Sequence, residues 1–390
     1  MTEPADRSGL RHARITGVDA ARAVALVGMF AVHLLPLRDD AGAETFTGAL
    51  ASGRASALFA VLAGVGVALA TGAATPPDGR RAHCAHGAAL LVRGLLVGLV
   101  GLVLVEFGPP VAVILAYYGL LFAVAIPFLR LRAGPLAALA VVCGLLTPVL
   151  SHLLRADLPG GPGEQPGLDA IADPAGLLTT LTLTGYYPVL TWTTYLFAGM
   201  AVGRLDLRRT RTAALLLAGG AALAAGASAV SAALLGAGGA AALGSELGDR
   251  RAGTVPTESW WWLAVQAPHT GTTPDLAHTT GTALAVLGAA LLVARFVPAL
   301  ARPAATVGAV PLTLYSGHAV VLALLAPIPA ADRAATMIVL VAVSVAVGVA
   351  LHLAGRRGPL EAVVAAAGRA AQRAVSPAAA RTAGSAPPPP

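Results

Sequence analysis

The chain has 390 residues, of which 56% are apolar and only 12% charged, and its formal net charge is +7. Soluble domains carry about 25% charged residues, so this composition excludes a soluble globule and favours a membrane protein. All basic residues are arginines, clustered between apolar runs. That pattern encodes membrane topology and excludes a nucleic-acid-binding face, so we expect no nucleic acid as partner.

Ten apolar runs follow one another along the chain, each near or above 18 residues and almost free of charge. This length lets a helix cross the hydrocarbon core of a bilayer. We therefore predict an all-α, polytopic membrane helix bundle of about ten transmembrane helices. The runs lie near residues 18–37, 54–72, 87–107, 110–128, 134–154, 186–204, 211–236, 276–297, 305–328 and 334–354.

The first run has a second interpretation, because arginines precede it and residues 41–43 resemble the cleavage site of a signal peptide. Arg38, Asp39 and Asp40 lie between the run and that site, so we favour an uncleaved first helix.

Arginines recur in every second connecting segment, while most acidic residues lie in the other segments. By the positive-inside rule both termini are predicted to be cytoplasmic.

Three regions are expected from the change in composition. Residues 1–13 form a flexible tail, residues 14–365 a membrane domain, and residues 366–390 a disordered tail rich in Ala, Pro and Arg. Trp260 to Trp262 predict a short helix at the membrane interface, at about residues 257–267.

Ionisable groups inside a span are costly, so each is a functional candidate. Asp19 and Arg22 open the first run. One interpretation is a helix cap with Thr16 as N-cap and an Asp19–Arg22 pair; the other is that Arg22 holds a phosphate of an acyl donor. His33 lies near the outer end of the same run, either as a hydrogen-bonding partner of another helix or as a general base.

Arg54 opens the second run on the outer side, where topology and the helix dipole both disfavour a cation. An anion bound there would relieve both penalties. The alternative is an ion pair with Asp39, Asp40 or Glu44.

The segment from His269 to His278 opens the eighth run. Thr273 is expected as N-cap and Asp275 as an acid in the first turn, which gives Asp275 a structural explanation. Capping does not explain His269, and we predict that His269 and Asp275 form a pair of general base and orienting acid if the loop folds back.

His318 lies in the middle of the ninth run, and Arg93 in the third. Tyr117 and Tyr187 belong to the fourth and sixth runs. Polar groups at this depth need partners, so we expect a polar cavity inside the bundle. Cys84 and Cys143 have no metal-binding spacing, and no metal is expected.

Spaced motifs from about residue 14 to 365 resemble the YeiB-like proteins of the heparan-alpha-glucosaminide N-acetyltransferase superfamily, most of all their actinobacterial branch. The resemblance rests on Arg14-Ile-Thr-Gly-Val-Asp19-Ala-Ala-Arg22, Gly28-Met-Phe-Ala-Val-His33, Ser52-Gly-Arg54, Tyr117-Tyr118, Tyr186-Tyr187-Pro188, the 268–282 segment, Tyr315-Ser-Gly-His318 and Gly358-Pro-Leu-Glu361.

The resemblance implies a multi-helix acyltransferase of the bacterial cytoplasmic (inner) membrane that uses acyl-CoA, such as acetyl-CoA, as donor. In the characterised lysosomal relative, acetyl-CoA binds on the cytosolic side, the acetyl group is moved to an amine across the membrane, and a histidine in the first lumenal loop is essential. Residues 38–53 contain no histidine here, and His33 is the nearest.

We therefore predict a membrane acyltransferase with His33, His269, Asp275 and His318 as catalytic candidates. Arg22, Arg54, Arg93, Tyr117 and Tyr187 are the candidates for binding donor or substrate. The expected partners are the lipid bilayer and a small-molecule, glycan or lipid acceptor on the outer side, and a homodimer is compatible with the sequence. The alternative is a transporter or flippase for a small anion or lipid, for which internal repeats and broken helices would be typical.

Overall fold

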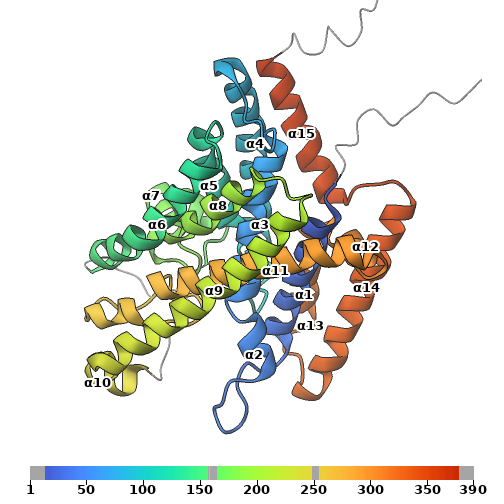
Figure 1. The fold of residues 1–390 in the computed structure, drawn as a ribbon. Helices are drawn as coiled ribbons and strands as arrows, with labels where there is room; N and C mark the ends of the chain where they lie inside the picture. Colours follow the sequence, from blue (N-terminus) through green and yellow to red (C-terminus); the bar gives the residue numbers. More distant parts are fainter. Residues whose placement is uncertain (1–13, 157, 159–164, 248–253, 377–390) are drawn as a thin grey trace, which may run out of the picture.

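The computed structural model describes residues 14–156, 158, 165–247 and 254–376, so both expected terminal tails lie partly or wholly outside it. Within these residues the chain is helical, with one isolated bridge between Arg38 and Glu44 and no strand. The expected all-α bundle is confirmed (Figure 1). The α-helices are α1 (Thr16–Leu34), α2 (Phe46–Ala51), α3 (Arg54–Ala70), α4 (Gly79–Val105), α5 (Leu115–Ala125), α6 (Ala133–Arg155), α7 (Pro174–Thr179), α8 (Val189–Gly203), α9 (Thr210–Leu234), α10 (Ala240–Leu243), α11 (Thr273–Phe296), α12 (Pro298–Gly308), α13 (Pro311–Leu325), α14 (Arg333–Leu353) and α15 (Pro359–Val375).

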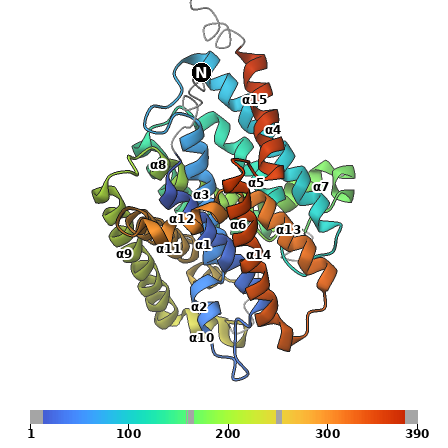
Figure 2. The same cartoon turned by 90° about the vertical axis from the view of Figure 1, so that its right-hand side faces the viewer.

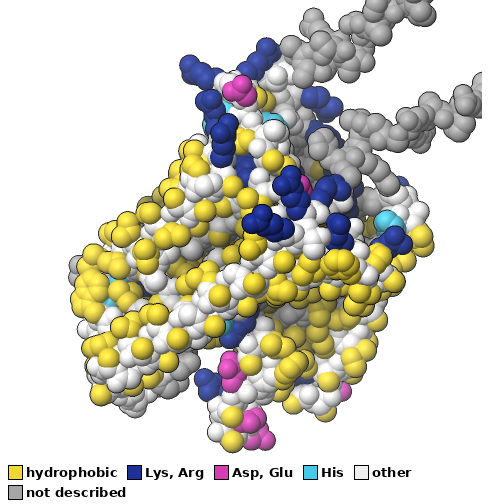
Figure 3. All heavy atoms as spheres, viewed as in Figure 1, with side chains coloured by type: hydrophobic (Ala, Val, Ile, Leu, Met, Phe, Trp, Pro, Cys, Tyr) yellow, Lys and Arg dark blue, Asp and Glu magenta, His cyan; other side chains and the backbone are white. Residues whose placement is uncertain are grey.

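Large apolar side chains cover the outer faces of α6, α9 and α14, where Leu146, Leu215 and Ile338 are all more than 60% exposed. In the space-filling view, hydrophobic side chains cover most of the surface below the arginines (Figure 3). Such a surface is stable in lipid but not in water, so the chain is a multi-pass membrane protein.

The number of long apolar helices is smaller than the expected ten spans. Among the described residues, seven helices are long and apolar enough to cross a membrane, or eight if the bent pair α12–α13 counts as one. The remaining apolar runs correspond to the shorter helices α5 and α8. Almost every residue of α8 is buried against other helices. An apolar run indicates burial equally well in protein and in lipid, so composition alone does not assign α5 and α8 as spans.

Glycines let the central helices approach closely. A Cβ atom on Gly281 of α11 would lie 2.6 Å from the carbonyl oxygen of Gly220 on α9, and one on Gly64 of α3 would lie 2.9 Å from the nitrogen of Met200 on α8. The two backbones of each pair are therefore in direct contact, as is common between membrane helices.

Arg204, directly after α8, joins three helices through its buried side chain. Its guanidinium donates hydrogen bonds to the carbonyl oxygens of Ala68, Thr71, Ala73, Leu129 and Leu131, and to the Thr71 hydroxyl. These carbonyls lie in the last turn of α3 or in the residues that follow α3 and α5, where a cation is favoured by the helix dipoles. The side chain thus fixes the ends of α3, α5 and α8 relative to one another.

Residues 366–375, which the sequence assigned to a disordered tail, are instead the second half of α15. Figures 1 and 2 show α15 lying beside α4, and Gly368 faces the backbone of Ala89 across that contact. The helix is amphipathic, since Val364 and Gly368 are buried while Arg369 and Arg373 are exposed. The arginines assigned to a polar tail are therefore the outer face of a helix.

The two ends of the molecule differ in charge. Most arginine side chains in view lie at the upper end, whereas most acidic side chains in view lie at the lower end, around the loop that precedes α2 (Figure 3). This segregation agrees with the alternation of arginines along the sequence. The cytoplasmic position of the arginine-rich end stays a prediction.

Candidate active site

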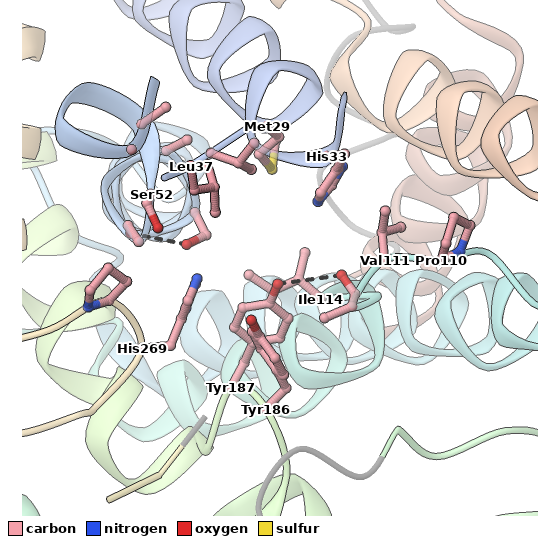
Figure 4. A pocket seen from close by; sticks show the side chains of 18 of the residues that line it. Met29, His33, Leu37, Ser52, Pro110, Val111, Ile114, Tyr186, Tyr187 and His269 are labelled. Carbon is pink, nitrogen blue, oxygen red and sulfur yellow. Dashed lines mark hydrogen bonds between the residues drawn. The ribbon is translucent and has the colours of Figure 1, made fainter. Parts of the chain in front are cut away.

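A cavity of about 870 Å³ lies at the acidic end of the bundle. It is within the range of about 300–1,000 Å³ that is usual for small-molecule sites. Its walls come from the end of α1, the turn between α2 and α3, residues 109–114, and the loops before α8 and α11. The rings of His33 and His269 extend into this space from different walls, with Tyr186 and Tyr187 beside it (Figure 4).

His33 is held by His318 of α13. Nδ1 of His318 lies 2.5 Å from the carbonyl oxygen of Tyr315 and must donate to it, since a carbonyl can only accept. Nε2 of His318 is therefore an acceptor, and it lies 3.1 Å from Nδ1 of His33, which must carry the hydrogen. It follows that Nε2 of His33 is unprotonated and able to take a proton.

His269 lies in the loop before α11 in a left-handed conformation with φ of 63°, which is rare for a residue with a side chain. Its ring packs against Tyr186 and Tyr187, with ring centroids 5.0 and 5.5 Å apart. Burial lowers the pKa of His269 to about 4, so its imidazole is neutral at pH 7. Strained backbone of this kind is concentrated at functional sites.

The loop of His269 rests directly on the turn between α2 and α3. Gly53 in that turn has a φ of 69°, and a Cβ there would lie 3.0 Å from Cα of Pro268. Only glycine allows both the conformation and the contact. The motif Ser52-Gly53-Arg54 thereby brings the His269 loop to the cavity.

Asp275 holds the His269 loop through its backbone. The carboxylate accepts a hydrogen bond of 3.0 Å from the Gly271 nitrogen. The N-cap of α11 is Thr272 rather than the expected Thr273, and its hydroxyl accepts from the Asp275 nitrogen at 3.3 Å. Asp275 bonds to the turn next to His269, while the expected base–orienter hydrogen bond to the imidazole stays a prediction.

Arg54 is the first residue of α3 and is half-buried beside the cavity, but it is not among the cavity-lining residues. Its Nε donates to Nε2 of His278 at 3.2 Å, and Nη1 reaches the carbonyls of Gly48 and Ser52 at 3.5 and 3.4 Å. The ion pairs formed within the described residues do not include Arg54, so the expected pair with Asp39, Asp40 or Glu44 is absent there.

A second cavity, of about 270 Å³, lies towards the arginine-rich end. Arg14, Arg22, Arg93 and Arg357 line it together with Tyr118. The expected pair of Arg22 and Asp19 is present, with 2.6 Å between Nη1 and Oδ1. Thr16 is not the cap, because α1 begins at Thr16 and Ile15 is its N-cap.

Two polar groups in the second cavity lack partners among the described residues. The half-buried guanidinium of Arg93 belongs to none of the ion pairs or hydrogen bonds found there. The buried hydroxyl of Tyr118 has no hydrogen-bond partner either. A cation and a donor left unpaired inside a membrane bundle are typical of a site that binds a polar or anionic ligand.

Tyr315 lines both cavities and is the residue that they share. Its hydroxyl accepts from the Ile114 nitrogen at 3.2 Å and donates to the Ala112 carbonyl at 3.4 Å. Its own carbonyl anchors His318. Tyr315 thus lies where the lining of the arginine-lined cavity meets the lining of the His33 cavity.

The family model for heparan-alpha-glucosaminide N-acetyltransferase, catalytic, matches residues 14–233. The chain belongs to this family. No curated protein matches it. The resemblance inferred from the motifs is therefore confirmed, and the chain is an N-acetyltransferase-type membrane protein.

The heparan-alpha-glucosaminide N-acetyltransferase region supplies His33, Arg22, Arg93 and Arg54, but His269 and His318 follow it in the sequence. The fold brings His318 of α13 into hydrogen-bonding contact with His33. It brings His269, from the loop before α11, to the same cavity. The described residues contain no group of three or more His, Cys, Asp or Glu that could hold a metal ion.

The tyrosines of this acetyltransferase-type site divide into lining and supporting residues. Tyr187 lines the large cavity and donates to the Ala112 carbonyl at 3.3 Å. Tyr117 is buried behind it, and its hydroxyl accepts from the Tyr186 nitrogen at 3.1 Å.

Sequence reasoning missed Gln165, which lines the large cavity from a Gly/Pro-rich loop. Its amide binds the backbone of Val111 and Val113. Gln165 lies outside the apolar runs, so the pattern of hydrophobic residues gave no signal for it.

Proposed function

We propose that the chain transfers an acyl group from an acyl-CoA thioester, bound in the arginine-lined cavity, to a hydroxyl or amine in the large cavity, with His33 as general base. The observation that carries this proposal is that Tyr315 lines both cavities. The large cavity holds a proton acceptor with a defined tautomer, and the arginine-lined cavity holds a cation without a partner among the described residues. Two substrates from opposite ends of the molecule could therefore meet there.

The donor half of the proposal rests on charge and on distance. The phosphates of coenzyme A would pair with Arg93, Arg22 and Arg357, which together supply guanidinium groups suited to phosphate. Arg22 and His33 are eleven residues apart on α1, or roughly 16 Å. A donor with a long, thin arm is needed to span that distance, and the Tyr118 hydroxyl could donate to a carbonyl along it.

The chemical step follows from the tautomers. Nε2 of His33 removes the proton of the acceptor O–H or N–H while the acceptor oxygen or nitrogen attacks the thioester carbonyl. The new C–O or C–N bond forms, the C–S bond breaks, and the thiolate takes the proton back from His33. His318 holds Nδ1 of His33 throughout, so the imidazolium that forms transiently stays hydrogen-bonded.

The acceptor half rests on the large cavity. Its volume of about 870 Å³ admits a molecule larger than the acyl group alone. Tyr186, Tyr187 and the neutral His269 offer flat surfaces and hydrogen-bonding groups. Glu44 and Arg38 at the mouth would favour a polar acceptor.

The test uses the full-length purified protein in lipid nanodiscs, with acetyl-CoA as donor and a panel of amines and alcohols as acceptors. Release of free coenzyme A is measured. His33→Ala should lower the rate by about 10² to 10⁴, the usual contribution of a general base. His352→Ala is the matched control, because His352 is exposed on α14 and lies outside the cavities described. Undiminished transfer by the folded His33→Ala protein would overturn the assignment.

One observation favours the transporter alternative. Helices α12 and α13 form a broken pair, bent by 66°, and α13 carries Tyr315 and His318 at the cavity wall. Broken helices at the binding site are typical of secondary transporters. Uptake of acyl-CoA or an anion into proteoliposomes that persists in His33→Ala would support transport, whereas coenzyme A release without uptake supports the transferase.

A further inference from the structure

Glu361 lies in the first turn of α15 and is not used by the proposed reaction. Within the described residues it is the only acid that lines the arginine-lined cavity, yet it forms none of the ion pairs found there. Its two carboxylate oxygens bind the start of α13 instead, the helix that carries Tyr315 and His318. The motif Gly358-Pro-Leu-Glu361 thereby joins two helices across 48 residues of sequence.

The carboxylate of Glu361 caps the N-terminus of α13. Oε1 accepts hydrogen bonds from the backbone nitrogens of Leu312 and Thr313 at 2.7 and 3.1 Å. Oε2 accepts from the Thr313 hydroxyl at 2.5 Å. The two nitrogens belong to the first turn of α13, where N–H groups have no partner within the helix. The residue before α13 is Val310, whose apolar side chain cannot serve as a cap, so the cap comes from α15.

The capping is reciprocal. The residue before α15 is Gly358, which has no side chain that could cap this helix. The Thr313 hydroxyl accepts a hydrogen bond of 3.3 Å from the Leu360 nitrogen in the first turn of α15. A Cβ atom on Gly358 would lie 2.7 Å from Oγ1 of Thr313, so glycine lets the two helix starts approach each other. Glu361 and Thr313 thus each cap the helix of the other.

A sharp bend in the chain explains why α13 needs this support. Helices α12 and α13 meet at 66°, and Pro311 at the first position of α13 has no N–H to donate. The direction of α13 therefore depends on contacts at its own start. Tyr315 follows two residues after the cap, and its carbonyl accepts from Nδ1 of His318. His318 in turn fixes the tautomer of His33.

We propose that Glu361 is a positioning residue for the acyl transfer, because its cap on α13 fixes where Tyr315 and His318 lie relative to His33. This role rests on the proposed function, since the histidine pair is what Glu361 positions. Its oxygens bind α13 and not the arginines of the donor cavity. Loss of the carboxylate should therefore lower turnover and leave donor binding almost unchanged.

The kinetic test compares Glu361→Ala with Glu361→Gln in the full-length protein in nanodiscs, by release of coenzyme A from acetyl-CoA. In Glu361→Ala the cap is lost, and kcat should fall about tenfold while the KM of acetyl-CoA stays within about twofold, because a small misplacement of reacting groups has a large effect on rate. Glu361→Gln keeps a carbonyl oxygen for the two backbone nitrogens, and its amide can donate to the Thr313 hydroxyl. It should recover most of kcat. Arg369→Ala is the matched control, since Arg369 is exposed on α15 and lines neither cavity.

Three kinetic results would overturn the positioning role of Glu361. A changed KM with an unchanged kcat would assign the residue to donor binding. An equal loss of kcat in the Ala and Gln variants would assign the effect to the negative charge. Full activity of Glu361→Ala would show that the histidine pair does not depend on the cap.

Hydrogen exchange separates this role from the proposed function, because it needs no substrate. The exchange of a peptide that covers residues 309–318 is followed by mass spectrometry. Glu361→Ala should speed its exchange about tenfold, whereas Glu361→Gln and Arg369→Ala should not. If the unchanged protein released no coenzyme A, the proposed function would fail, and faster exchange in Glu361→Ala would still support the hold of Glu361 on α13. Unchanged exchange in Glu361→Ala would overturn that hold whatever the activity.

Discussion

The large cavity and the arginine-lined cavity meet at Tyr315 but are built in different ways. The large cavity is formed mainly by irregular segments, and it gathers His33, His269 and two tyrosines at the ends of helices. The arginine-lined cavity lies mainly between regular helices, and arginines project into it from α1 and α4. Irregular backbone is tolerated in a membrane protein where it lines a cavity, and here it lies next to the proposed chemistry.

This difference suggests a division of roles. Charges on regular helices would bind the donor, and their removal should weaken binding. The hydrogen-bonded pair of His33 on α1 and His318 on α13, next to the irregular segments of the large cavity, would perform the reaction, and its removal should lower turnover. The four predictions below test that division, from the largest expected effect to the smallest.

Replacement of His318 tests the histidine pair. His318→Leu removes the acceptor of the His33 Nδ1 hydrogen, so the tautomer of His33 is no longer fixed. We expect kcat to fall about hundredfold with the KM of the donor unchanged. His318→Gln offers a carbonyl oxygen near the position of Nε2 and should restore part of the loss. Equal loss in both variants would point to a role in packing against Phe30 and Tyr315 instead.

Replacement of Arg93 tests the donor cavity. Arg93→Gln removes a cation that has no partner within the described residues, so a bound phosphate would lose a charge-assisted hydrogen bond. The KM of acetyl-CoA should rise about tenfold with kcat little changed. Arg132→Gln, at an exposed position outside the cavities described, should leave the KM unaltered. A fall in kcat alone would contradict the division of roles.

The pH dependence tests the burial of His269. Burial lowers the pKa of His269 to about 4, below the ordinary value near 6.5, so His269 should stay neutral down to about pH 5. The unfolded state binds the proton below pH 6.5 and the native state does not. Stability should therefore fall as pH decreases from 6.5 towards 4, by about 1.4 kcal/mol per pH unit.

The measurement for His269 is the midpoint of thermal unfolding at pH 7.5 and 5.5. His269→Gln should show a smaller decrease between the two pH values than the unchanged protein. An identical decrease in both would assign the pH dependence to other groups.

Replacement of Thr272 tests the loop that carries His269. Thr272→Ala removes the N-cap hydroxyl of α11, which also donates to the Val265 carbonyl at 2.6 Å. The loss should cost about 1 kcal/mol of stability and lower kcat severalfold by loosening the turn. Thr282→Ala is the control, because Thr282 is on the same helix but only binds its own preceding turn.

The fold was largely predictable from the sequence because lipid imposes a strong constraint on composition. Runs of apolar residues and alternating arginines identified the helices, and the Asp19–Arg22 pair followed from helical spacing. The same signal could not separate α5 and α8, which are short and packed in the core, from helices that span the membrane. It also missed the second half of α15, because the exposed arginines of this amphipathic helix were interpreted as part of a polar tail.

The candidate site was predictable as a set of residue types but not as a set of contacts. His33, His269 and His318 were each singled out as costly groups in a membrane, yet no spacing linked α1 to α13. The partner of Arg54 is His278, which is neither an anion nor one of the expected carboxylates. Such pairs depend on how the helices dock, and local sequence does not encode that.

Tyr315 has a consequence for the membrane as a whole. The cavities on its two sides are each several times larger than the volume of about 30 Å³ that a water molecule occupies in the liquid. Water could therefore approach this ring from both ends. Because Tyr315 lines both cavities, we expect a smaller residue at this position to bring the two water-accessible spaces closer together and to raise the leak of protons across the bilayer when no substrate is present.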